Sequence, residues 1–128
     1  MKHSEEGEQK ALFDWAQYVP ACRWLFAVPN GGNRNPREAA RLKAGGVKAG
    51  VSDVFLPVPT ESTEELSDTG YHGLFIEMKR RKVDGTSRVS DDQKAFQDAM
   101  VSAGYKCAVC YGAEEAIEVI RKYLGLAV

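Results

Sequence analysis

The segment Leu74-Phe75-Ile76-Glu77-Met78-Lys79-Arg80 has the composition of a buried β-strand that carries charged residues. Side chains two residues apart project from the same face of a strand, so Glu77 and Lys79 point together while Ile76 and Met78 point to the other face. Such a charged pair is costly to bury unless it has partners. A lone Glu-x-Lys also leaves open the more common alternative, the exposed face of an edge strand.

A second buried strand precedes this segment along the chain. Val54 to Val58 is apolar and partly β-branched, with Asp53 at its start and prolines at its end. Residues 60–72 are mostly polar and predict a mobile loop between the two strands. Consecutive strands usually lie next to each other, so we expect Asp53 and Glu77 to meet in space.

The N-terminal segment predicts one helix and one strand. Glu5 to Tyr18 is typical of an amphipathic helix, because Leu12 and Trp15 recur at helical spacing. Glu8 shares their face, so its carboxylate is expected to point inward. Trp24 to Pro29 is typical of a strand, and we expect both tryptophans to pack in the core.

Two helices begin at recognisable capping patterns. Asn35-Pro36 predicts a helix that ends at Gly45-Gly46. Ser90 and Gln93 have the spacing of a capping box at the start of another helix, and Gln93 lies on its apolar face. Gln93 is therefore expected either to cap this helix or to face a site in the interior.

The C-terminal segment predicts a strand over Tyr105 to Tyr111 and an amphipathic helix over Glu114 to Leu124. Together these elements predict an α/β fold with a mixed central sheet of about four strands flanked by helices. We expect one domain over residues 1–128, with residues 1–4 disordered.

Composition indicates a soluble, cytoplasmic protein. Hydrophobic residues make up 44% of the 128 residues, and no apolar run approaches the roughly 20 residues that cross a bilayer. We therefore expect no membrane association. The N-terminus lacks a secretion signal, and three cysteines form no disulfide pattern. Cys107 and Cys110 are expected to point to opposite faces of a strand, which favours core packing over zinc binding.

Basic residues are concentrated in two segments, although the formal net charge is only -1. Residues 34–48 and residues 79–88 each carry five basic residues and one acidic residue. Both could border a phosphate backbone, and solvated surface charge explains them equally well. The candidate nucleic-acid contacts are Asn30, Arg34, Arg37, Lys48, Arg80 and Arg81.

Two carboxylates beside one lysine suggest a site for a hard metal ion. Oxygen ligands from Asp53 and Glu77 suit Mg²⁺ or Mn²⁺. A cation there could polarise a phosphate and activate water, while Lys79 adds positive charge beside the attacking water. This chemistry would hydrolyse phosphodiester bonds.

The order of these features resembles the PD-(D/E)xK nuclease superfamily. More closely, three motifs resemble the VRR-NUC, or virus-type replication-repair nuclease, family: Val28-Pro29-Asn30-Gly31-Gly32, the glycine-rich run from Gly46 to Asp53, and Glu77-Met78-Lys79. The match extends over nearly the whole chain. Ser52 stands where the superfamily usually has proline, at a position that varies.

The resemblance implies a restriction-endonuclease-like core and a role for each matching residue. Asp53 and Glu77 would bind the metal together with the main-chain carbonyl of Met78, and Lys79 would be the catalytic lysine. Glu8 would assist the metal site, and Gln93 matches a glutamine of the family's helix. Glu8 could instead be an ordinary acid near a helix start, stabilised by the helix dipole.

Stand-alone relatives imply a homodimeric Mg²⁺- or Mn²⁺-dependent DNA endonuclease that prefers branched DNA such as four-way junctions. If the chain is viral, its compartment would be the cytoplasm of a bacterial host. Two other classes remain open: a nonenzymatic nucleic-acid-binding or replication-accessory module with the same fold, and an acid/base enzyme that uses Asp53 and Glu77 on a small substrate.

Overall fold

The computed structural model describes residues 4–29, 35–61, 70–85 and 87–126. Its strands and α-helices follow one another in the order α1 (Glu5–Ala16), β1 (Phe26–Ala27), α2 (Pro36–Ala44), β2 (Val54–Leu56), β3 (Leu74–Lys79), α3 (Asp91–Ser102), β4 (Lys106–Tyr111) and α4 (Ala113–Leu124). Two short 3₁₀ helices, η1 (Pro20–Cys22) and η3 (Lys82–Asp84), lie between them. The predicted helices and strands are all present, with bounds shifted by a few residues.

The four strands form one mixed sheet in the order β1-β2-β3-β4. β1 pairs with β2, and β2 with β3, in antiparallel fashion, whereas β4 runs parallel to β3. β3 is therefore a central strand, which rules out the edge-strand alternative for Glu77 and Lys79. The predicted α/β fold with a mixed four-stranded sheet is confirmed.

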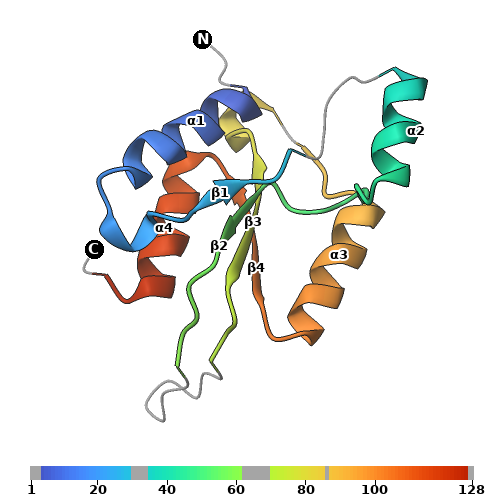
Figure 1. Cartoon of the computed structure of the whole chain (residues 1–128). Coiled ribbons are helices and arrows are strands. Elements are labelled where there is room, and N and C mark those ends of the chain that lie inside the picture. Colours follow the sequence, from blue (N-terminus) through green and yellow to red (C-terminus); the bar gives the residue numbers. More distant parts are fainter. Residues whose placement is uncertain (1–3, 30–34, 62–69, 86, 127–128) are drawn as a thin grey trace.

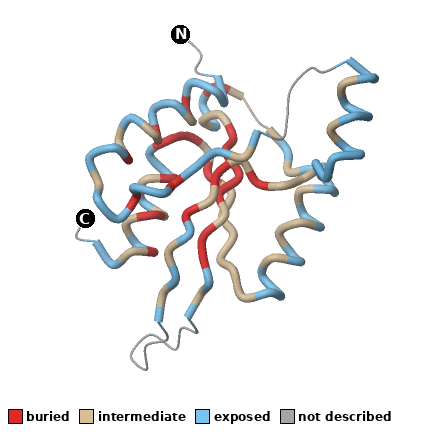
Figure 2. Tube along the Cα trace, in the orientation of Figure 1, coloured by how far each residue is buried: buried red, intermediate tan, exposed pale blue. Residues whose placement is uncertain are grey.

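Helices cover both faces of the sheet. α1 and α4 pack side by side on one face, and α3 lies on the other (Figure 1). Under α1 and α4, the core is fully buried and aliphatic, with Leu12, Ile76 and Ile120 at 0% exposure (Figure 2). Under α3 the packing is aromatic, because Phe75 lies 4.4 Å from Phe55 and 5.1 Å from Phe96 between ring centroids.

The first helix begins at a residue that was expected to be disordered. Ser4 is the N-cap of α1, and its hydroxyl accepts a hydrogen bond from the Gly7 N–H at 3.0 Å. The prediction of disorder over residues 1–4 therefore stays a prediction: Ser4 caps the helix, and residues 1–3 lie outside the described residues.

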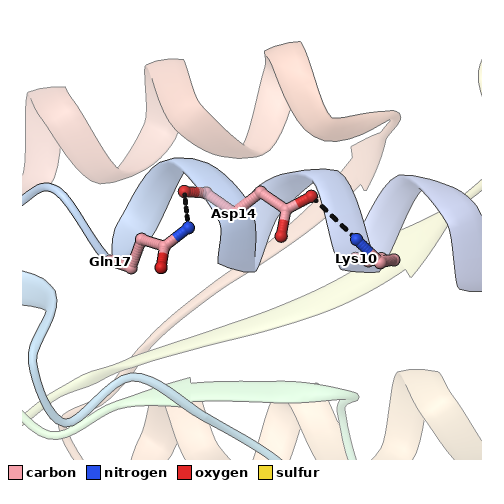
Figure 3. Close-up of polar contacts among 3 residues, drawn as sticks. All are labelled: Lys10, Asp14 and Gln17. Atoms are coloured by element: carbon pink, nitrogen blue, oxygen red, sulfur yellow. Dashed lines mark hydrogen bonds and ion pairs between the residues drawn. The ribbon is translucent and has the colours of Figure 1, made fainter.

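The solvent face of α1 carries two short-range polar contacts near its C-terminal end. Lys10 Nζ lies 3.0 Å from Asp14 Oδ2, and Gln17 Nε2 donates to the Asp14 main-chain oxygen at 3.1 Å (Figure 3). Exposed pairs of this kind contribute little to stability. The buried side of α1, not this face, attaches the helix to the sheet.

The strand predicted from Trp24 is shorter than expected, and Trp24 is not in the core. η1 turns the chain so that Cys22 and Leu25 are buried, which leaves Trp24 68% exposed. The Arg23 guanidinium lies 5.5 Å from the centre of its ring. The prediction for Trp24 was wrong because it assumed a strand. A 3₁₀ turn precedes Trp24 instead and determines which residues of this segment point inward.

The connection between β2 and β3 is ordered at its base. Thr60 N–H donates to the Tyr71 carbonyl and Tyr71 N–H donates to the Thr60 hydroxyl, both at 2.9 Å. Thr60 and Tyr71 thus pair across the two ends of the segment 60–72, whose mobility stays a prediction, and residues 62–69 lie outside the described part of the chain.

The two cysteines of β4 point to opposite faces as predicted. Cys110 is fully buried in the core, and Cys107 lies with Sγ 3.8 Å from the Gln97 carbonyl of α3.

Among the described helices, none has the length and apolar character that a membrane span requires.

Candidate active site

Asp53 and Glu77 face each other across neighbouring strands. Val54 pairs with Ile76 in the β2–β3 ladder, so Asp53, one residue further, lies across from Glu77. Asp53 Oδ2 accepts a hydrogen bond from the Met78 N–H at 2.7 Å, which fixes its side chain against β3. The expectation that the two carboxylates meet is confirmed. Like charges directly opposite in a sheet are destabilising unless a cation lies near them.

The Glu77 side chain is buried and short of partners. It is 3% exposed, and its Oε1 has no hydrogen-bond partner among the described residues. Burial, the hydrogen bond with Asp53 and the charge of Asp53 raise the pKa of Glu77 to about 9, against a lowering effect of Lys79. The positive charge of Lys79 therefore does not offset the effects of burial and Asp53 on Glu77.

Lys79 is buried beside this pair on the same strand. It is 6% exposed, and its Nζ donates to Gln93 Oε1 at 3.2 Å. Gln93 Oε1 also accepts the Ser90 N–H at 2.9 Å, and the Ser90 hydroxyl accepts the Gln93 N–H at 3.1 Å, which completes the predicted capping box. Gln93 thus fills both roles that the sequence left open.

A glycine holds α3 close to the segment that leads to Asp53. Gly50 has a φ of +87°, and a Cβ there would lie 2.3 Å from the Asp92 carbonyl oxygen and 2.9 Å from Gln93 N. Only glycine allows this approach. The glycine two positions before Ser52 therefore sets where the start of α3, and with it Gln93, lies relative to Asp53.

Glu8 is buried as predicted, with its carboxylate bonded to the start of another helix. It is 5% exposed, and its Oε1 accepts the Ala113 N–H of α4 at 3.0 Å. This contact satisfies one of the free N–H groups at a helix N-terminus. Among the described residues, no cluster of three or more His, Cys, Asp or Glu side chains could hold a metal ion. A metal-binding role for Glu8 stays a prediction.

A cavity of about 400 Å³ opens beside Asp53 and is lined by a residue that the sequence did not single out. Its lining includes Asp53, Met78 and Pro29, together with Glu5 of α1. The charge of Glu5 also helps to raise the pKa of Glu77, after burial and Asp53. Two acids of α1, Glu5 and Glu6, therefore line this cavity, and Glu5 lies one helical turn before Glu8.

The predicted DNA-contacting residues are not gathered in one place. Arg37 and Lys48 are exposed on and after α2, whereas Arg80 and Arg81 follow β3 and are half-buried. Arg81 Nε donates to Asp84 Oδ2 at 2.8 Å, and Asp84 raises the pKa of Arg81. Arg81 thus already pairs with an acid of its own loop. Asn30 and Arg34 lie outside the described residues.

The residues at this site fit a divalent cation with oxygen ligands. The observation that decides the fit is the buried, unpartnered Glu77 Oε1, which lies across the ladder from a second carboxylate. A hard cation held by Asp53 and Glu77 would supply the missing positive charge.

The sequence matches the model of one protein family, the VRR-NUC domain, over residues 3–114. The chain belongs to the VRR-NUC family. This is a family of nucleases, so the chain is a nuclease-type protein. A solved structure described as a VRR_NUC domain protein is similar to this VRR-NUC chain with a TM-score of 0.79 and 26% identity, covering 99% of this chain and 93% of that one. The comparison with curated proteins finds no match.

Proposed function

We propose that this VRR-NUC protein is a Mg²⁺- or Mn²⁺-dependent endonuclease that hydrolyses phosphodiester bonds in DNA. The observation that carries the proposal is the Asp53–Glu77 pair, with its unpartnered buried oxygen, on the same sheet face as Lys79. A small-substrate acid/base enzyme would need an enclosed pocket, whereas the cavity beside Asp53 is bordered by the exposed start of α1.

Each residue of the site has a distinct part in the proposed reaction. Asp53 and Glu77 would hold the cation, and the Met78 main-chain carbonyl is a third candidate ligand. A divalent cation held there would supply positive charge to the scissile phosphate and acidify water. Lys79, anchored by Gln93, places a positive charge where negative charge develops on the phosphate.

The proposal extends to branched DNA, such as a four-way junction, and to a homodimer. Support for a second copy comes from β1, the outermost strand in the order of the sheet, where two aromatic side chains are exposed. Phe26 of β1 is 48% exposed, and Trp24, two residues before it, is 68% exposed. Exposed aromatic side chains at a sheet edge are typical of protein contacts. Sedimentation velocity of the parent and of Trp24→Ser tests this: we expect a dimer that the substitution weakens, and a parent monomer would contradict it.

Cleavage of a labelled four-way junction and a matched linear duplex tests the activity. The expected result is strand scission with Mg²⁺ or Mn²⁺, faster on the junction, and none with EDTA or in Lys79→Ala. Equal rates on both substrates would contradict the branched-DNA preference alone. DNA binding without metal-dependent scission of either substrate would contradict the enzyme and favour a nonenzymatic binding module.

A further inference from the structure

Helix α2 projects from the rest of the molecule. None of its residues is buried, and it stands apart from α1 and α4 on the side of α3 (Figures 1 and 2). A nine-residue helix gains little stability by itself in water. The Asn35 side chain caps its first turn, and Gly50, six residues after its end, packs closely against the start of α3.

The exposed surface of α2 is basic. Arg37, Arg41 and Lys43 lie on the helix and Lys48 follows it, and all four are exposed. None of them forms an ion pair within the described part of the chain. Arg37 and Arg41 are one turn apart, so they share a face of the helix. Their positive charge is therefore available to an anionic partner.

Both ends of α2 connect to segments that border the candidate active site. Before the helix, Pro29 lines the cavity beside Asp53, and Val28 N–H donates to the Asp53 carbonyl at 2.7 Å. After the helix, Gly50 packs against Gln93, the partner of Lys79. The basic helix is thus an insertion between two parts of one site.

We propose that α2 is a docking surface for the phosphate backbone of duplex DNA on one side of the cleaved bond. The place of the cleaved bond relative to α2 rests on the proposed function. Binding of DNA by α2 does not require that the DNA be cleaved. Arg37 and Arg41 contact phosphates and leave base identity unread, so binding is electrostatic and salt-dependent.

A second copy of the chain is the other possible occupant of this surface. A twofold contact through α2 would place the same basic residues against each other. Like charges in such a contact repel, whereas a polyanion complements them. The charge of α2 therefore favours DNA.

The test compares two variants that lose the same charge. Arg37→Gln/Arg41→Gln alters α2, and Lys106→Gln/Lys122→Gln alters the opposite end of the sheet, where both lysines line another cavity. Glutamine keeps helix propensity close to that of arginine. Binding of a fluorescein-labelled duplex is measured by anisotropy in EDTA, at several KCl concentrations, with sedimentation velocity on the same samples.

We expect the α2 variant to bind about tenfold more weakly, with the slope of log K against log salt reduced by about 2, while the control resembles the parent. Equal effects of the two variants, no effect of either, or a parent that does not bind would overturn the proposal. Loss of self-association with unchanged DNA binding would assign α2 to a second copy. A parent that binds as described and never cleaves would refute the proposed function alone.

Discussion

Lys79 Nζ donates to Gln93 Oε1 at 3.2 Å, and this contact joins the central strand β3 to the first turn of α3. The same oxygen accepts the Ser90 N–H at 2.9 Å, at the N-cap of that helix. One side-chain oxygen therefore both caps α3 and holds the lysine of the proposed site. A change at Gln93 is therefore expected to affect both the capping of α3 and the position of the Lys79 amine.

Gln93→Ala should lower the cleavage rate by at least tenfold. The substitution removes the hydrogen-bond partner of Lys79, and it also removes a side-chain cap of α3. Ser90→Ala is the matched control: it removes the hydroxyl that caps the Gln93 N–H and leaves Gln93 Oε1 in place. Both variants should lose about 1 kcal/mol of stability. Thermal melting and single-turnover cleavage check this, and similar rates for the two variants would show that the Lys79 contact is unimportant.

Gly50→Ala should cost much more stability than Gly46→Ala. Both glycines have positive φ, +87° and +105°, so alanine is strained at each by roughly 1 kcal/mol. At Gly50 the new Cβ would also meet the backbone of Asp92 at 2.3 Å, whereas at Gly46 nothing lies within 4 Å. We expect an additional loss of about 1–3 kcal/mol at Gly50. Urea denaturation measures both, and equal losses would refute the close approach to α3.

The free energy of unfolding of the metal-free protein should fall as the pH rises from 4.5 towards 9. Burial and Asp53 raise the pKa of Glu77 from 4.5 to about 9. Between these values the native state holds a proton that the unfolded chain has lost, so stability decreases with pH. Glu77→Gln removes this dependence and, at pH 8, should melt at a higher temperature than the parent.

The same variant tests the link between this carboxylate and the cation. Mg²⁺ should raise the melting temperature of the parent at pH 8 and leave that of Glu77→Gln unchanged, because binding to the native state alone stabilises it. Parallel pH profiles for the two metal-free proteins, or an equal Mg²⁺ shift, would argue against Glu77 as the buried metal ligand.

Glu5 and Glu8 should behave differently when each is changed to glutamine. Glu8→Gln weakens the contact with the N-terminus of α4, so we expect a loss of about 1 kcal/mol of stability. Glu5→Gln should leave stability within about 0.5 kcal/mol, since Glu5 is exposed. It should instead weaken Mg²⁺ activation of cleavage, because Glu5 lines the cavity beside Asp53. The reverse pattern would assign the metal-site role to Glu8.

The sequence predicted those parts of the structure that depend on local pattern. Alternation of apolar and polar residues predicted the strands around Glu77 and Val54. Capping chemistry predicted the helix starts at Asn35 and Ser90, and helical spacing predicted the inward side of α1. The pairing of Asp53 with Glu77 followed because consecutive strands usually adjoin.

The sequence did not predict features that depend on how elements pack. The exposure of Trp24 comes from a 3₁₀ turn, and the place of Glu5 comes from the packing of α1 against β3, which brings its first turn beside Asp53 and Met78. The lack of buried residues in α2 is likewise a property of its place in the fold. No repeating pattern of apolar and polar residues in the sequence indicates any of these three features.

Diffraction from crystals soaked in Mn²⁺, recorded with anomalous scattering, shows whether Asp53 and Glu77 hold a cation. We expect an anomalous peak between the carboxylates of Asp53 and Glu77, with the Met78 carbonyl among its oxygen ligands, and loss of that peak in Glu77→Gln. Crystals of the parent without a peak at these carboxylates, under conditions in which the protein cleaves DNA, would contradict it.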